Sequence, residues 1–128
     1  MVDTIKVTDA GMSIVTNRLK NSGTSPDYVH WGTGTTPAAD GNTALETASG
    51  HESRTAGAMT QQDTNVTNDT FQVVGTITCA TSAKAITEAG LFDASTSGNC
   101  FLHGTFSAIN VNVADSIEFT VKAAFDQA

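Results

Sequence analysis

The last part of the chain alternates regularly between apolar and polar residues, and this period of two constrains the fold more than any other feature. The apolar positions are Ile117, Phe119, Val121, Ala123 and Phe125, and the polar positions between them are Glu118, Thr120 and Lys122. A period of two is that of a β-strand with one buried and one exposed face. The pattern therefore predicts a strand near the carboxyl end that lies on the core with its apolar face.

The preceding residues repeat the strand pattern at intervals of roughly ten residues. The stretch from Phe71 to Cys79 alternates, residues 85–92 form a second predicted strand, and residues 93–99 (DASTSGN) form a turn. A further strand begins at Cys100 and is expected to place Cys100, Leu102 and Phe106 on one face. Strands of this spacing with polar turns predict a mainly antiparallel, jelly-roll-like β-sandwich. The predicted core residues are Phe71, Ile77, Leu91, Phe106, Ile117, Phe119 and Val121.

The composition agrees with an all-β fold. Charged residues make up 15% of the chain, against about 25% in an average soluble domain. Threonine is the most frequent residue, and its β-branched side chain favours strands while its hydroxyl keeps a solvent-facing sheet wet. We therefore expect a sheet surface that threonine covers in place of charge.

The amino-terminal half holds the two exceptions to the strand pattern. Residues 8–22 predict one short helix, which Thr8 or Asp9 caps and in which Met12, Val15 and Leu19 recur at helical spacing. Residues 35–64 are polar and contain few apolar residues, which predicts a long extended loop or arm, with an edge strand as an alternative for its second half. Residues 65–126 form the expected sandwich core, and residues 1–128 form a single domain.

The sequence Gly32-Thr33-Gly34 follows a hydrophobic run and is similar in outline to a phosphate-binding loop. A dinucleotide fingerprint requires a third glycine at position 37, which is proline, and a phosphate loop continues into Gly-Lys-Ser/Thr and a helix. Neither follows here. We therefore interpret Gly32 and Gly34 as a structural loop that supplies a positive φ or a bulge where a strand ends, and we expect no bound cofactor.

The remaining reactive side chains show no catalytic or metal-binding spacing. His30, His51 and His103 form no ligand pair, and no Gly-x-Ser-x-Gly elbow is present. Cys79 and Cys100 lack Cys-x-x-Cys spacing and are expected to be buried apolar residues. These observations predict a protein without catalytic, cofactor or metal residues.

Two acidic residues in the carboxyl-terminal half were considered as a pair. Glu88 and Asp93 lie five residues apart on a strand and turn, so they are expected to face opposite sides and not to pair as the acids of a glycosidase, and Asp93 is typical of a turn. Glu88 lies between Ile86 and Ala89 in an apolar strand, so its carboxylate needs backbone amides or Arg54 as partners if it is buried.

The formal net charge of −7 comes from 13 acidic and 6 basic residues. Direct nucleic-acid binding requires clustered Lys and Arg, which the chain lacks. No apolar stretch reaches the roughly 18 residues of a membrane-spanning helix, and no secretory segment is evident at the amino terminus. We therefore expect a soluble protein made in the cytosol, with neither nucleic acid nor a membrane as its partner.

Several stretches resemble small virion proteins of tailed bacteriophages over residues 27–125. They are the WGTG loop at 31–34, the AITEAGLFDA strand and turn at 85–94, and the closing segment FSAINVNVADSI at 106–117. The resemblance implies a non-enzymatic structural protein made in the host cytoplasm, in particular a capsid decoration (cement) protein on the outside of the head. Its implied partners are the major capsid protein and further copies of itself, with a trimer favoured because symmetry and avidity strengthen modest contacts.

Two alternatives of other classes remain open. A tail-fibre or baseplate module would share the ITEAGLFD motif, and a carbohydrate-binding or hydrolytic sandwich would require an aromatic platform or paired acids, for which the chain offers little beyond Tyr28 and Trp31. Under the decoration hypothesis, the segment 35–64 reaches onto a neighbouring subunit or the shell and becomes ordered in the assembly.

Overall fold

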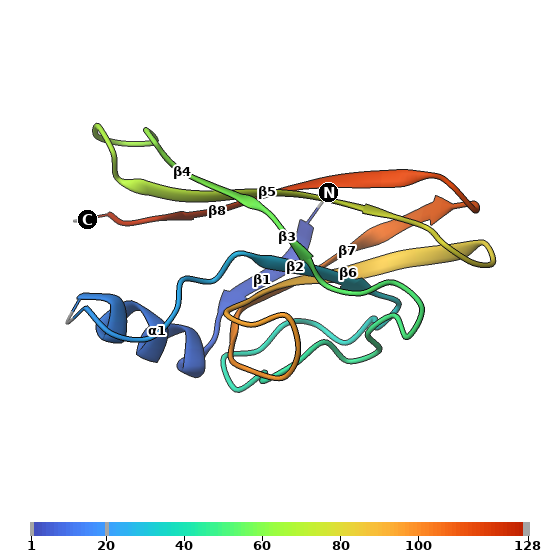
Figure 1. Cartoon of the computed structure of the whole chain (residues 1–128), viewed down its shortest axis with the longest axis horizontal. Coiled ribbons are helices and arrows are strands. Elements are labelled where there is room, and N and C mark those ends of the chain that lie inside the picture. Colours follow the sequence, from blue (N-terminus) through green and yellow to red (C-terminus); the bar gives the residue numbers. More distant parts are fainter. Residues whose placement is uncertain (1, 20, 127–128) are drawn as a thin grey trace.

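The fold is an antiparallel β-sandwich with a single helix (Figure 1), in a computed structural model that describes residues 2–19 and 21–126. In chain order the elements are β1 (Val2–Val7), α1 (Asp9–Leu19), β2 (Tyr28–Gly32), β3 (Thr55–Ala56), β4 (Ala58–Gln62), β5 (Thr70–Thr78), β6 (Lys84–Phe92), β7 (Cys100–Val111) and β8 (Ser116–Ala124). One sheet has the strand order β1-β7-β6-β2-β3 and the other the order β4-β5-β8. Each paired strand runs antiparallel to its neighbour.

The alternation in β5 and β8 places apolar residues toward the core and polar residues toward solvent, as the sequence predicts. In β5, Val73 and Ile77 are buried, while Thr76 and Thr78 are exposed. In β8 exposed residues alternate with half-buried ones from end to end, so this strand lies at the margin of the core. Phe125 departs from the prediction, because it follows the end of β8 and is 58% exposed.

The centre of the core lies between the two sheets at Val29 and Trp31 of β2, which are fully buried. The indole of Trp31 meets the ring of Phe119 edge-on, with the ring centroids 6.4 Å apart, a favourable aromatic geometry. Of the residues predicted for the core, Ile77 and Leu91 are buried. The others are partly buried and pack against the buried cluster: Phe71, Phe106, Ile117, Phe119 and Val121.

A bulge in β7 changes the face on which Cys100 lies. Leu91 pairs with Leu102, but Phe92 pairs with Cys100, so Phe101 is an extra residue in the ladder. Leu102 and Phe106 pack with the main core, whereas Cys100 packs with Phe92 in a second cluster. The expectation that Cys100, Leu102 and Phe106 share one face is therefore wrong, because simple alternation does not continue through a bulge.

Helix α1 begins at the predicted cap. The hydroxyl oxygen of Thr8 accepts a hydrogen bond from the amide of Gly11 at 2.9 Å, which is the geometry of an N-cap. The buried side of the helix carries Gly11 and Ile14. The predicted apolar stripe is wrong for Met12 and Leu19, which are 59% and 83% exposed.

The helix ends earlier than the predicted residue 22, at Leu19. Asn21 and Gly23 adopt the positive φ values of 63° and 72° that are typical of the residues after a helix. The amide of Ser22 donates to the carbonyl oxygen of Asn17 at 2.8 Å, which satisfies one of the last helical carbonyl groups. Residue 20, which falls within the predicted helix, lies outside the described residues.

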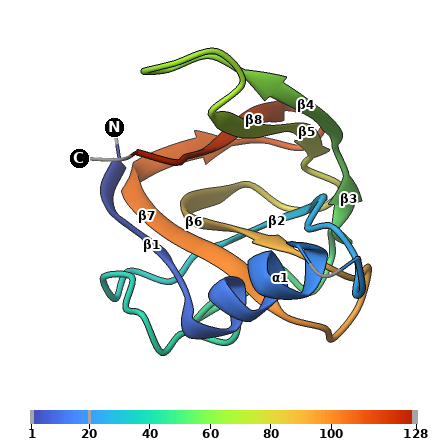
Figure 2. The same ribbon diagram turned by 90° about the vertical axis from the view of Figure 1, so that its left-hand side faces the viewer.

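Two parts of the amino-terminal half differ from the sequence-based expectation. Residues Val2–Val7 form an edge strand, β1, which pairs with β7 and which the sequence pattern did not reveal. The predicted arm at 35–64 contains β3 and β4, so the edge-strand alternative applies to its second half. These two short strands carry the chain from the large sheet to the small one along one side of the sandwich (Figure 2).

The first half of that segment folds back on the protein as a covering loop, defined here as residues 33–54. It lies against the outer face of the large sheet, opposite the small sheet (Figure 1). Its backbone is tied to β2 by a hydrogen bond from Ser49 to Trp31 and by a bridge between Ala48 and Gly32, and Leu45 is buried with Phe92. The covering loop is therefore held on the protein's own sheet and is not an extended arm, while contact of the segment 35–64 with a neighbouring subunit or the shell stays a prediction.

The described residues include no helix with the length and apolar character that crossing a bilayer requires.

Gly11 provides a test of how closely α1 packs on β7. A Cβ atom at this position would overlap the carbonyl oxygen of Phe101. Alanine normally stabilises a helix by about 1 kcal/mol relative to glycine, but here we expect Gly11→Ala to lower the free energy of unfolding by about 1–3 kcal/mol through overpacking. Gly41→Ala is the control, because nothing lies within 4 Å of a Cβ there. Urea unfolding compares the two, and a stabilised Gly11→Ala variant would show that the helix can move away from β7.

Candidate functional site

A buried carboxylate lies between the large sheet and its covering loop. Glu88 projects from β6 and is fully buried. One carboxylate oxygen accepts hydrogen bonds from the amides of Gly34 and Thr47 at 3.1 and 2.7 Å, and the other accepts from the amide of Glu46 at 3.0 Å. His103 Nε2 lies 2.8 Å from that second oxygen. Four groups from the loop and β7 therefore surround this one carboxylate.

His103 extends the network to the loop on its other side. Its Nδ1 lies 2.8 Å from the side-chain oxygen of Asn42, which also accepts a hydrogen bond from the amide of Ala39. Because this oxygen and the carboxylate of Glu88 are both acceptors, both contacts are hydrogen bonds when each ring nitrogen carries a proton. The His103 ring is thus held between Glu88 of β6 and Asn42 of the covering loop.

The structure confirms one of the two proposed partners of Glu88 and excludes the other. Backbone amides bind its carboxylate, as expected for a buried acid in an apolar strand. Arg54 does not, because its guanidinium donates to the carbonyl oxygens of Ala94 and Ser97 at 2.8 and 2.7 Å and stacks 3.6 Å from the centre of the Phe92 ring. The residue that sequence reasoning missed is His103, which is brought beside Glu88 by pairing between β6 and β7.

The Gly32-Thr33-Gly34 loop directs its amides at carboxylates of the same chain. Gly34 donates to Glu88, while the amides of Thr35 and Thr36 donate to one oxygen of Glu46 at 2.8 and 3.0 Å. The hydroxyl and amide of Thr36 and the amide of Thr35 lower the pKa of Glu46 below its usual value. The amides of this loop thus bind anions, and these anions are the carboxylates of Glu88 and Glu46 from the same chain.

The physical reason why positions 32 and 34 are glycine differs from the expected one. The glycines with positive φ in the described residues are Gly23 and Gly98, so positive φ does not explain Gly32 or Gly34. A Cβ at Gly32 would overlap the carbonyl oxygen of Thr47, and a Cβ at Gly34 would lie 2.6 Å from the Cβ of Glu46. Both are glycines because Glu46 and Thr47 of the covering loop lie directly against them.

A second buried carboxylate, that of Glu52, lies where the covering loop ends. It accepts hydrogen bonds from Trp31 Nε1 at 2.9 Å and Ser49 Oγ at 2.7 Å, and Lys84 Nζ lies 2.8 Å away. Burial alone would raise the pKa of Glu52, but the hydrogen bonds from Lys84, Ser49 and Trp31 outweigh it and lower the pKa to about 2. Nothing in the polar stretch around Glu52 indicated this role.

The other candidate residues do not converge on these carboxylates as a reactive centre. His30 is buried and its Nε2 lies 2.8 Å from the carbonyl oxygen of Glu52, while His51 is exposed. Cys79 and Cys100 are free and buried, as predicted, and burial raises the pKa of Cys100 to about 11. Within residues 2–19 and 21–126, no three His, Cys, Asp or Glu side chains are placed to hold a metal ion.

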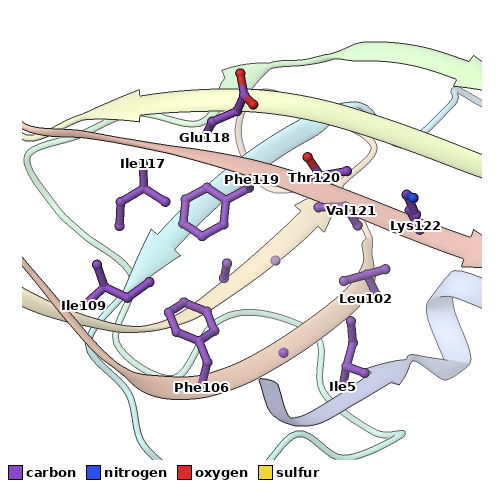
Figure 3. A pocket seen from close by; sticks show the side chains of 13 residues that line it. Ile5, Leu102, Phe106, Ile109, Ile117, Glu118, Phe119, Thr120, Val121 and Lys122 are labelled. Carbon is purple, nitrogen blue, oxygen red and sulfur yellow. The ribbon is translucent and has the colours of Figure 1, made fainter. Parts of the chain in front are cut away.

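An apolar groove lies on the side of the sandwich opposite the β3–β4 crossing. Figure 3 shows Ile117, Phe119 and Val121 of β8 above the groove, with Phe106 and Leu102 of β7 below. Its volume is about 290 Å³. A second hollow continues it toward α1 and shares Ile5, Leu102 and Lys122 with it. We call this region the open side.

The open side is also where both sheets end. Strand β1 is the edge of the large sheet and β8 is an edge of the small one. Ile5 of β1 is half exposed there, and Ile109 and Phe125 are exposed as well. Edge strands beside an exposed apolar groove are features that proteins usually cover or pair.

The chain matches the model of a known family. The family model of the podophage GP4 fiber I protein gp80 matches residues 15–124, which extend from within α1 to the end of β8. No curated protein and no solved structure matches the chain.

The Glu88 network predicts an order of tolerance at this position. Glu88→Leu leaves four donors without an acceptor, of which the Gly34 amide and His103 are buried, and it should lower the free energy of unfolding by about 3–5 kcal/mol. Glu88→Gln keeps one oxygen and should cost about 1–3 kcal/mol. Asp126→Asn, at an exposed residue after the end of β8, is the control and should change stability by less than about 0.5 kcal/mol. Denaturant unfolding measures all three, and equal small effects at Glu88 would contradict the buried network.

The low pKa of Glu52 predicts a pH-dependent contribution to stability. In the folded protein this pKa is about 2, against an ordinary value of 4.5. A lowered folded-state pKa stabilises the protein above the ordinary value, and this contribution disappears as the pH falls toward 2. The stability difference between the wild type and Glu52→Gln should therefore be largest near neutral pH and shrink between about pH 4.5 and 2. Urea unfolding at several pH values tests this, and a difference that is independent of pH would contradict it.

Proposed function

The chain belongs to the podophage GP4 fiber I protein gp80 family, and from this premise we propose that it is a structural subunit of a phage fibre. The family match covers β2 to β8, so it concerns most of the sandwich and not one motif. It makes the chain a phage structural protein, as the sequence resemblance implied. The family description names a fiber protein, which favours the fibre alternative over the expected capsid decoration.

The open side supports a structural role in an assembly. A subunit that functions alone has no physical reason to keep an apolar groove beside two unpaired strand edges, since water is a poor partner for both. A fibre subunit is in permanent contact with other chains, and such contacts are more apolar than the rest of a protein surface. Within this proposal the two buried carboxylates hold the fold and catalyse no reaction.

The location of the protein on the virion tests the proposal. Gold-labelled antibodies raised against the purified chain should bind at fibres in electron micrographs of intact particles. Particles that lack the protein should keep their DNA on heating as well as the parent phage does, and should lose fibres. Dense labelling of the head together with heat-labile heads would instead support capsid decoration, because a cement protein stabilises the assembled shell that it binds.

A further inference from the structure

Strand β8 has a long, regular and unpaired edge. Its nine residues pair with β5 without a register shift, from Ser116 opposite Thr78 to Ala124 opposite Thr70. It contains no proline. Among the described strands only β5 is its neighbour, so the backbone groups of its other edge have no partner strand. Natural proteins usually interrupt such an edge with a bulge, a proline or an inward-pointing charge.

The exposed face of β8 carries two charges, and they are symmetric about its middle residue. Thr120 is the central residue of Ser116–Ala124, with Glu118 two positions before it and Lys122 two positions after it. If a second copy pairs antiparallel about a two-fold axis at Thr120, Glu118 of each copy lies opposite Lys122 of the other. Opposite charges that face each other across a strand pair are favourable.

The inner face of β8 is equally suited to this register. Phe119 of each copy lies opposite Val121 of the other, and aromatic side chains pair well with β-branched ones. A two-fold axis perpendicular to the sheet keeps the same face inward in both copies. The half-buried side chains that roof the groove in Figure 3 would then continue from one copy into the next.

Other symmetric registers of β8 are less favourable. An axis at Glu118 or at Lys122 places like charges opposite each other, which is destabilising. An axis at Phe119 places Glu118 opposite Thr120 and Lys122 opposite Ser116. It also leaves residues at the end of the strand unpaired. The register about Thr120 alone pairs all nine residues and matches both charges.

We propose that β8 is the site at which two copies of this chain associate, by antiparallel pairing about Thr120. The product is a continuous sheet with the order β4-β5-β8-β8-β5-β4. This inference rests on the proposed role as a subunit of an assembly and names the strand that carries one of its contacts. Its symmetry is two-fold and so differs from that of the trimer expected from the sequence resemblance.

A symmetric cysteine tests the pairing directly. Thr120 faces Thr120 of the second copy at the axis, where Cβ atoms of opposed residues are about 4.5–5.5 Å apart, close enough for a disulfide after small adjustments. Thr120→Cys should form a covalent dimer on mild oxidation. Thr76→Cys is the matched control, since Thr76 is exposed on the same face but lies on the inner strand β5, opposite Glu118. The native cysteines are buried and should not interfere. Crosslinking no faster than in the control would overturn the proposal.

Charge-reversal variants distinguish pairing of β8 with a second copy from protection of a free β8 edge by Lys122. By sedimentation, Glu118→Lys and Lys122→Glu should each weaken the wild-type dimer at least about tenfold, because each places like charges opposite each other, and the double variant should restore it. If Lys122 instead guards the edge, the wild type is monomeric and Lys122→Glu does not weaken any association, which refutes the proposal. A trimer without Thr120 crosslinking also refutes it. All of these outcomes are independent of where labelled virions show the protein, so the β8 interface and the fibre assignment can fail separately.

Discussion

The hydrogen bonds to the carboxylate of Glu88 are the interactions that hold the covering loop on the outer face of the large sheet. This carboxylate accepts hydrogen bonds from the amides of Gly34, Glu46 and Thr47, and His103 Nε2 lies beside it. A buried carboxylate is costly unless its oxygens are fully hydrogen-bonded. The loop amides must therefore lie beside Glu88, so a polar contact positions a loop that has few apolar residues of its own.

The same geometry explains why a loop with two glycines can be similar to a nucleotide-binding motif and still be structural. Amides that converge on an anion need close approach of the backbone, and close approach needs glycine. In a phosphate loop the anion belongs to the ligand. Here it is supplied by Glu88 and Glu46 from elsewhere in the chain, so the physical principle is shared while the role is internal.

The two sides of the sandwich are physically different. On one side β3 and β4 cross from sheet to sheet (Figure 2), and the nearby Glu52 is bound to Trp31 and Lys84. On the other side the sheets end at β1 and β8 with an apolar groove between them. A partner that adds strands or fills the groove has access on this side, and this asymmetry links the fold to the proposed assembly.

Period-two alternation by itself determined the strands β5, β6 and β8, the antiparallel sandwich and the face of Phe119 that meets the core, because alternation is a local consequence of strand geometry. It also showed that Glu88 would need buried partners. It could not identify them, since His103 and the covering loop reach Glu88 only through strand pairing and chain reversal. The faces of Cys100 and Met12 were likewise set by a bulge in β7 and by the close approach of α1 to that strand. Only the tertiary structure decided these points, because each depends on contacts between residues that the sequence pattern does not connect.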